Sequence, residues 1–463
     1  MRALRNIYKD EVDFTALALQ SPEFAKYLKS NGQLDFSDPD AVRQLTKSLL
    51  QRDFELKVEI PENRLCPPVP NRLNYILWLQ DLLDTTGDEY RDNYDPDREV
   101  IGLDMYFTTP PSENSVANPL VKWDRMLQYL PPARLFHATS LALRRNRYVQ
   151  YYAVCAFTHT YADIDKDNIR TSRDTISKNK LDSRIEIIQT DPKDELIPLD
   201  TKLNVDRLDF TMCNPPFYAS RDELIASAEA KERPPFSACT GAEVEMVTTG
   251  GEIAFITRMI EESLRLRERV IWYTTMLGKL SSVSVLIETL LEHKNNNYAV
   301  TEFVQGNKTR RWAIAWSWTD LRPTVSIARG TTAIPKHLLP FPSEYIFTTQ
   351  SESIDEVSAK IDSELSALHV QWLWRKNLAT GVGFAMQNVW SRQARRKMQN
   401  PDAMAEMGEI DETKAALGFK VQCKKDAIDE KGVRVIVRWL KGRDTVLFES
   451  FCGMLKRKVE SNQ

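Results

Sequence analysis

Residues 206–217 read Asp-Arg-Leu-Asp-Phe-Thr-Met-Cys-Asn-Pro-Pro-Phe. The segment from Asp206 to Cys213 predicts a buried strand, and the Asn-Pro and Pro-Pro pairs that follow it are typical of a turn that ends a strand. In doubly wound sheets, ligands bind at the carboxyl ends of the strands. We therefore expect Asn214 and the residues after it to face a binding crevice.

On both sides of this segment, strands alternate with helices. That alternation predicts an α/β fold with a mainly parallel, doubly wound sheet. Further strands are expected over 100–104, 160–165, 184–190, 298–305 and 312–318, with an apolar segment over 270–277. Helices are expected over 167–180, 252–269 and 280–293.

The sheet region is flanked by two others, which gives three predicted domains. Residues 1–98 form a helical extension, with helices over 10–28, 40–54 and 72–83, and residues 99–325 hold the sheet. Residues 335–463 form a small C-terminal α+β domain. Its expected elements are a strand over 345–349, a helix over 353–368, strands over 419–424 and 433–440, a short segment over 445–447 and a helix over 449–456.

Composition excludes several classes of protein. The chain has 463 residues, 42% of them hydrophobic, and a net charge of −3, so any RNA binding must come from local basic patches. The six cysteines form no C-x-x-C pair and have no histidine at ligand spacing, so we expect no metal site. The start of the chain is charged, and no run of 18 apolar residues occurs in it. We therefore expect a protein that is neither secreted nor membrane-spanning.

The Asn-Pro-Pro-Phe motif suits methylation of the exocyclic amine of adenine. The side-chain oxygen of Asn214 and the carbonyl of Pro215 can each accept one N–H bond of that amine, and Pro216 helps to hold the carbonyl in place. Phe217 offers a flat apolar face on which an extruded base can stack. No general base is required, because the methylated nitrogen is cationic and loses its proton easily. The alternative interpretation is a proline-rich turn that only closes a strand.

Asp163 is a second candidate, because an acidic residue at the end of the second strand commonly accepts hydrogen bonds from a ribose. The alternative is a helix N-cap or a solvated loop acid. Asp165 suits the cap better, since Lys166 opens the expected helix.

Including this motif, several short sequence blocks between residues 1 and 320 occur in the same order as in one known family. They are Asp38–Arg43, Pro68–Tyr75, Asn214–Phe217, Gly250–Glu252, Trp272–Tyr273, Met276–Lys279, Thr301–Phe303 and Arg311–Ala313. With these blocks the chain resembles the adenine-N6 RNA methyltransferases that modify U6 spliceosomal RNA, the eukaryotic methyltransferase-16-like family, which is related to a bacterial 23S ribosomal RNA adenine methylase.

The resemblance implies a Rossmann-like domain that uses S-adenosyl-L-methionine as its cofactor. Arg72 would lie near the methionine end of the cofactor, Asp163 at its ribose, and Asn214 at both cofactor and target base. The alternative for Arg72 is a surface arginine at a helix start. The resemblance also implies a monomeric protein of the nucleus, with the cytoplasm as an alternative compartment, whose partner is structured RNA. The basic residues of its N-terminal extension (Arg2, Arg5 and Lys9) would lie in the RNA groove.

One departure from the family concerns its Gly-x-Gly cofactor loop. The chain has no glycine between Gly102 and Gly241, and Asp163 lies 59 positions after Asp104, where a spacing of roughly 20 is usual. The residues that begin at Arg145 can be encoded as CGG AAC CGG TAC GTC CAG TAT TAC, which gives Gly-Thr-Gly-Thr-Ser-Ser-Ile when it is read one base later. Residues 105–159 are therefore either a translated intron or shifted frame, or a genuine insertion that impairs cofactor binding.

The C-terminal domain carries aromatic residues among basic ones, a combination that suits RNA binding and is equally typical of core tryptophans beside solvated cations. The residues are Trp372, Trp374, Trp390 and Trp439, with the basic cluster Arg392, Arg395, Arg396 and Lys397.

Two functions remain as alternatives to RNA methylation. One is a non-catalytic RNA-binding protein with an impaired cofactor site. The other is a protein-glutamine methyltransferase, since Asn-Pro-Pro-aromatic motifs also position amide nitrogens.

Overall fold

The fold was obtained as a computed structural model, which describes residues 6–8, 10–60, 66, 69–87, 90, 98–105, 157–163, 166–191, 193–223, 226, 247–305, 309–351, 353–398, 409–426 and 432–460. The chain divides into two compact units. Unit 1 comprises Met1–Asp84, Asn93–Trp318 and Gly330–Leu338, and unit 2 comprises Thr85–Asp92, Thr319–Arg329 and Leu339–Gln463.

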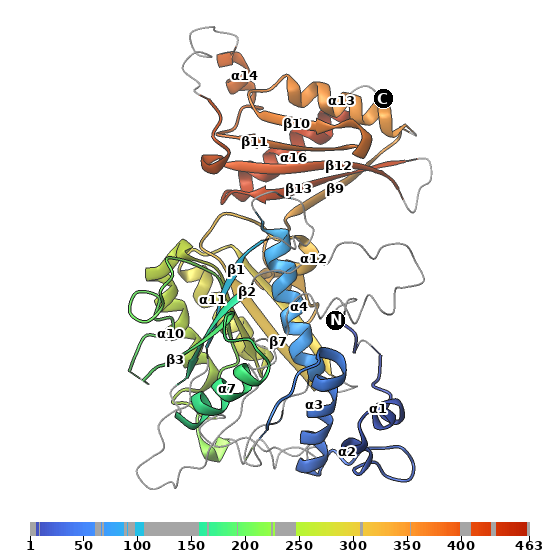
Figure 1. Ribbon diagram of the computed structural model, residues 1–463. Helices are drawn as coiled ribbons and strands as arrows, with labels where there is room; N and C mark the ends of the chain where they lie inside the picture. The colour runs from blue at the N-terminus through green and yellow to red at the C-terminus, as the bar shows by residue number, and fades with distance from the viewer. Residues whose placement is uncertain are drawn as a thin grey trace. The chain divides into compact units, whose positions relative to one another are not determined.

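Unit 1 is built on an eight-stranded sheet with the order β3-β2-β1-β4-β5-β7-β6-β8 (Figure 1). Strands β3, β2, β1, β4 and β5 run parallel to one another, and β7 runs antiparallel to both β5 and β6. The mainly parallel, doubly wound sheet is thereby confirmed as a Rossmann-like fold. Its strands are β1 (Val100–Met105), β2 (Phe157–Asp163), β3 (Ile185–Gln189), β4 (Leu208–Cys213), β5 (Val270–Leu277), β6 (Tyr298–Gln305), β7 (Thr309–Trp316) and β8 (Arg329–Gly330).

Helices pack on both faces of this sheet, as the alternation of side chains along β5 shows. Thr274 faces helix α4 (Val69–Thr85), where its hydroxyl lies 2.7 Å from that of Tyr75. The next side chain back, Tyr273, faces the opposite way and stacks on Trp316 at 5.6 Å between ring centroids. The Trp316 indole donates to Ser263 of α10 (Gly251–Leu266) at 3.0 Å, and α11 (Leu280–Glu292) packs beside α10.

The N-terminal helices differ from the expectation at one point. A single helix over 10–28 was wrong: the chain forms α1 (Phe14–Gln20) and α2 (Pro22–Ala25), separated at Ser21, whose backbone is extended. Pro22 explains the break, because proline disfavours a helical conformation in the residue before it. Helix α3 (Pro39–Phe54) begins one residue before its expected start, with Asp38 as its N-cap. Apolar side chains of α3, α4 and α7 (Lys166–Lys178) share one core.

The strand order reverses between β1 and β4, which makes this pair the topological switch point of the sheet. Met105 of β1 pairs with Cys213 of β4, so both strands end side by side at their carboxyl edge. The ring of Phe210 lies directly over Gly102, where an added Cβ would come within 2.1 Å of the ring. The absence of a side chain at Gly102 therefore lets the two strands pair closely where the site begins.

Unit 2 is an antiparallel sheet of five strands in the order β10-β11-β12-β13-β9. Helices α13 (Ile354–Ser366) and α16 (Thr445–Glu460) pack on one of its faces. The expected separate segment over 445–447 was wrong, because those residues open α16. Two strands, β10 and β11, were not predicted. The strands are β9 (Glu344–Thr349), β10 (Gln371–Arg375), β11 (Thr380–Ala385), β12 (Leu417–Lys425) and β13 (Val433–Lys441).

Candidate active site

The Asn-Pro-Pro-Phe segment begins where β4 ends. Pro215 and Pro216 are buried, whereas Asn214 and Phe217 are partly exposed. The end of β4 is held by α4, because the phenol of Tyr75 lies 3.4 Å from the amide nitrogen of Cys213 as its acceptor. Burial raises the pKa of Tyr75 far above its ordinary value, so this phenol stays neutral. The motif is therefore fixed at its start by a rigid strand and an adjacent helix.

The chain after the motif is tied to two other segments. The carbonyl of Tyr218 accepts from the amide of Thr248 at 2.9 Å. The carboxylate of Glu223 accepts from the amide of Ala219 at 2.7 Å and from the ammonium of Lys279 at 2.5 Å. These contacts lower the pKa of Glu223, with the Lys279 hydrogen bond as the largest cause. The loop over 214–223 is thus anchored at both ends.

Glu252 of α10 lies under the turn between β5 and α11. Its carboxylate accepts from the amides of Gly278 at 2.7 Å and Lys279 at 3.2 Å, while the residue is only 2% exposed. Burial raises its pKa, and hydrogen bonds from Ser282 and the two amides oppose that shift. A buried carboxylate in this setting is stabilised by donors that the turn supplies.

The ring of Phe217 lies between the β5–α11 turn and a cation. A Cβ at Gly278 would lie 3.0 Å from the ring, and the guanidinium of Arg311 lies 5.5 Å from the ring centroid, within range of a cation–π interaction. Burial lowers the pKa of Arg311, and the nearby charge of Arg72 lowers it further. Two guanidinium groups held close together favour an anionic group beside them.

Arg72 and Asp163 reach the carboxyl edge from different elements. Arg72 lies on α4, is 8% exposed and donates to the sulfur of Met276 at 2.8 Å. Asp163 is the last residue of β2, where its backbone pairs with Gln189 of β3. Asp104 at the end of β1 is 3% exposed. The backbone of β1, β2 and β4 and the α4 helix thus bring the predicted positions to one edge.

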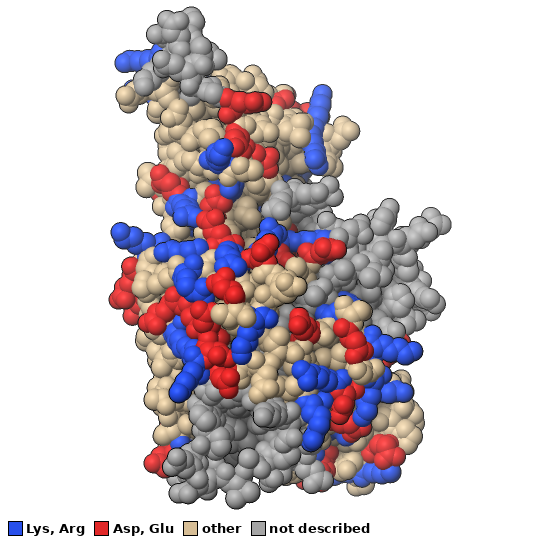
Figure 2. All heavy atoms as spheres, turned by 60° about the vertical axis from the view of Figure 1, so that its left-hand side comes forward, with Lys and Arg blue, Asp and Glu red and all other residues tan. Residues whose placement is uncertain are grey.

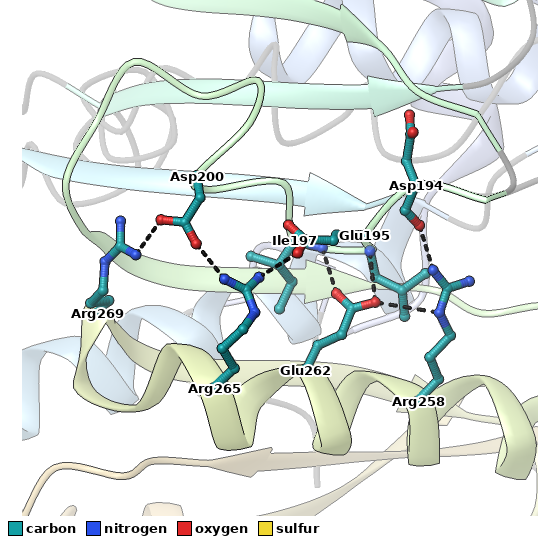
Figure 3. Close-up of polar contacts among 9 residues, drawn as sticks. Asp194, Glu195, Ile197, Asp200, Arg258, Glu262, Arg265 and Arg269 are labelled. Carbon is teal, nitrogen blue, oxygen red and sulfur yellow. Dashed lines mark hydrogen bonds and ion pairs between the residues drawn. The ribbon is translucent and has the colours of Figure 1, made fainter.

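A ladder of charged residues ties the connection between β3 and β4 to α10 (Figure 3). Glu262 accepts from the amides of Leu196 at 2.9 Å and Ile197 at 3.0 Å, and Arg258 lies 3.3 Å from Glu262. The remaining contacts are Arg258 to the carbonyl of Asp194, Arg265 to Glu195 and Asp200, and Arg269 to Asp200. One helix therefore carries Glu252 at its start and Arg258, Glu262 and Arg265 along its length, and Arg269 follows it in the short 3-10 helix Arg267–Arg269.

On the face drawn in Figure 2, basic and acidic side chains are interleaved rather than gathered by sign. That pattern fits the small net charge, and the described residues of this face form no continuous basic stripe. Across the described ranges, no group of three or more His, Cys, Asp or Glu side chains could hold a metal ion. None of the described helices is both long and apolar enough to cross a membrane.

Three residues near the motif were not assigned a role from the sequence: Glu252, Gly278 and Arg311. Each belongs to a block that supported the resemblance, namely Gly-Gly-Glu, Met-Leu-Gly-Lys and Arg-Trp-Ala. The signal was therefore present, but only the fold shows that these blocks meet Phe217.

Comparison with known proteins gives a family match and relatives that are similar over nearly their whole length. A family model described as RNA methyltransferase matches residues 2–104 and 152–320. The U6 small nuclear RNA (adenine-(43)-N(6))-methyltransferase of Schizosaccharomyces pombe is 33% identical, covering 94% of this chain and 97% of that protein. The RNA N(6)-adenosine-methyltransferase mettl16 of Danio rerio is 29% identical, covering 98% and 96%. Among solved structures, the chain is similar to the hMettl16 catalytic domain in complex with MAT2A 3′UTR hairpin 1. The two share 32% sequence identity with a TM-score of 0.51, and the match covers 69% of this chain and 96% of that one.

Proposed function

The chain belongs to this RNA methyltransferase family, and we propose that it methylates the N6 amine of an adenosine in U6 small nuclear RNA, using S-adenosylmethionine. The observation that carries the proposal is the Asn-Pro-Pro-Phe segment at the switch point of a Rossmann-like sheet. A U6 substrate places the enzyme in the nucleus.

The described residues fit such a cofactor. Arg72 is a buried guanidinium suited to a carboxylate, and Asp163 ends the strand whose acidic residue commonly holds a ribose. S-adenosylmethionine, when bound, supplies an electrophilic methyl group. No metal is needed for this chemistry.

The residues of the motif bind and orient the amine. Asn214 and the carbonyl of Pro215 accept its two N–H bonds, the two prolines hold these acceptors in place, and Phe217 stacks on the base. The anchors of the loop limit its motion, so little ordering remains to be done when RNA binds.

The test compares the full chain with Asn214→Ala. Methyl transfer to a U6-derived hairpin is expected for the wild type, and the variant should lose turnover while its RNA affinity stays within about twofold. Retained turnover would disprove the role of Asn214. Transfer to a glutamine-containing protein but not to RNA would favour a protein-glutamine methyltransferase instead.

Residues 105–159 bear on whether this chain binds its cofactor. The family match stops at residue 104 and resumes at 152, which supports an anomalous segment at the position of the missing Gly-x-Gly loop. We propose that the segment is translated from an intron or a shifted frame. The coding DNA tests this: the hypothesis fails if no frame through codons 145–151 encodes a glycine loop.

Titration calorimetry with S-adenosylmethionine tests the alternative, a genuine insertion that leaves a non-catalytic RNA-binding protein. Binding by the full chain would rule that alternative out, and its absence together with normal RNA affinity would support it.

We also propose that unit 2 contributes to RNA binding through the sheet face opposite α13 and α16. Lys424 and Arg434 pair across β12 and β13 on that face. The tryptophans are less suited to the role, since Trp390 and Trp439 are buried at 3% and 1% exposure and belong to the core. Reversing both charges with Lys424→Glu and Arg434→Glu should weaken RNA binding and flatten its salt dependence. Unchanged affinity and salt slope would refute this role.

A further inference from the structure

The turn before α11 is held by a carboxylate from another helix. The N-cap residue of α11, Lys279, makes no side-chain cap hydrogen bond. The amides of Gly278 and Lys279, which precede the first turn of the helix, donate to Glu252 of α10. A local N-cap would accept from amides inside the first turn. Glu252 therefore holds the turn itself, a role that a Ser, Thr, Asp or Asn cap at position 279 would not supply.

The same turn supports the aromatic residue of the motif. Gly278 is so close to Phe217 that an added Cβ would lie 3.0 Å from Cδ1 and 3.3 Å from Cγ of the ring, and 3.3 Å from Oε2 of Glu252. Cβ contacts this short require the neighbour to move. The Gly278 backbone thus lies against both the Phe217 ring and the Glu252 carboxylate, which accepts its amide hydrogen bond.

The other side of the loop is held through the neighbouring residue. Lys279 pairs with Glu223 at 2.5 Å, and Glu223 accepts from the amide of Ala219. The loop over 214–223 is therefore connected to Glu252 through Gly278 on the ring side and through Lys279 on its far side.

We propose that Glu252 is a positioning residue for methyl transfer: acting through Gly278 and Lys279, it sets the orientation of the Phe217 ring on which the target adenine stacks. This inference rests on the proposed function. Glu252 touches neither base nor cofactor, and its effect is transmitted by backbone atoms.

The test uses a U6-derived hairpin with 2-aminopurine in place of the target adenosine, whose emission changes when the base leaves the helix and stacks in the site. The variants are Glu252→Gln, which keeps the shape and removes the charge, and Gly278→Ala, which pushes directly on the ring. Glu261→Gln, an exposed position on the same helix, is the matched control.

Both variants should bind the hairpin within about twofold of wild type and show an altered 2-aminopurine emission. In methylation assays kcat should fall by at least about tenfold with KM for RNA little changed, since only the alignment of the base is lost. Glu261→Gln should match wild type. Circular dichroism checks folding, and Glu252→Asp, which keeps the charge and shortens the side chain, decides the matter if Glu252→Gln does not fold.

The outcomes separate the two proposals. Wild-type emission and unchanged kcat in folded Glu252→Gln overturn the role of Glu252, whatever Gly278→Ala shows, and leave the proposed function standing. A wild-type chain that neither shifts the emission of the probe nor binds the hairpin counts against the proposed function itself.

Discussion

Replacing Glu262 with alanine should open the connection between β3 and β4. The carboxylate satisfies the amides of Leu196 and Ile197, both of which belong to residues with 0% exposure. Without it, two buried amide groups lose their acceptor. A buried donor left unsatisfied costs about 1–3 kcal/mol, so the pair is expected to cost about 3 kcal/mol in free energy of unfolding. That value corresponds to roughly a 150-fold change in the opening equilibrium of this segment.

Hydrogen exchange followed by mass spectrometry measures this opening directly. Peptides that contain Leu196 and Ile197 should lose protection in Glu262→Ala, while peptides from unit 2 should not change. Glu262→Gln keeps one acceptor oxygen and should give a smaller loss. Glu261→Ala, at the exposed neighbouring position, is the control. Equal exchange in Glu262→Ala and Glu261→Ala would refute the reasoning and would mean that the ladder is a surface feature of little energetic value.

Three further predictions concern stability and reactivity. Gly102→Ala should destabilise the chain by about 1–3 kcal/mol in urea unfolding, because the added Cβ overlaps Phe210, whereas Gly453→Ala in α16 has room and should be neutral or slightly stabilising. Because burial raises the pKa of Glu252 above its ordinary value of 4.5, the Glu252 carboxylate binds a proton more tightly in the native chain than in the unfolded chain. The free energy of unfolding should therefore fall as pH rises from 4.5 through the native pKa, and Glu252→Gln should remove that fall; an unchanged pH profile would contradict the assignment. Burial raises the pKa of Cys66 to about 11, so iodoacetamide should label it about 100-fold more slowly at pH 8 in the native than in the unfolded chain, as mass spectrometry can measure.

The strands and helices of the sheet region could be predicted because the spacing of apolar residues within each segment indicates its type. The boundaries of β6 were predicted as they stand, and β4 was placed within two residues. In unit 2, β10 and β11 were missed. Gly381 and Gly383 interrupt the strand pattern, and they are there because Trp372, Trp374 and Phe419 occupy the space that a Cβ would fill. Only cross-strand packing explains such glycines.

The candidate site was predictable where a contiguous motif marks it. Asn214 and Phe217 follow from Asn-Pro-Pro-Phe after a strand, although their roles stay predictions until tested. The contacts that hold Phe217 come from Gly278 and Arg311, which are far from it in sequence and reach it only when β5 and β7 pair. A spacing argument cannot find such partners. The side chain of Asp163, and the other predictions for residues 106–156, lie outside the described residues.

The pairing of β1 with β2 has a consequence for the gene. Val100 to Met105 pair in parallel with Phe157 to Ala162, and both strands take the places that a doubly wound sheet assigns to them. Residues 105 and 157–159 therefore belong to the sheet, so the proposed intron or shifted frame would be confined to 106–156, and codons on both sides of it would be translated in the native phase. On that proposal, the retained or shifted nucleotides must leave the phase intact, so their net addition is a multiple of three and contains no stop. Transcripts that lack the segment can be searched for on that criterion, and a shorter protein with the same two strands would carry the glycine turn between them.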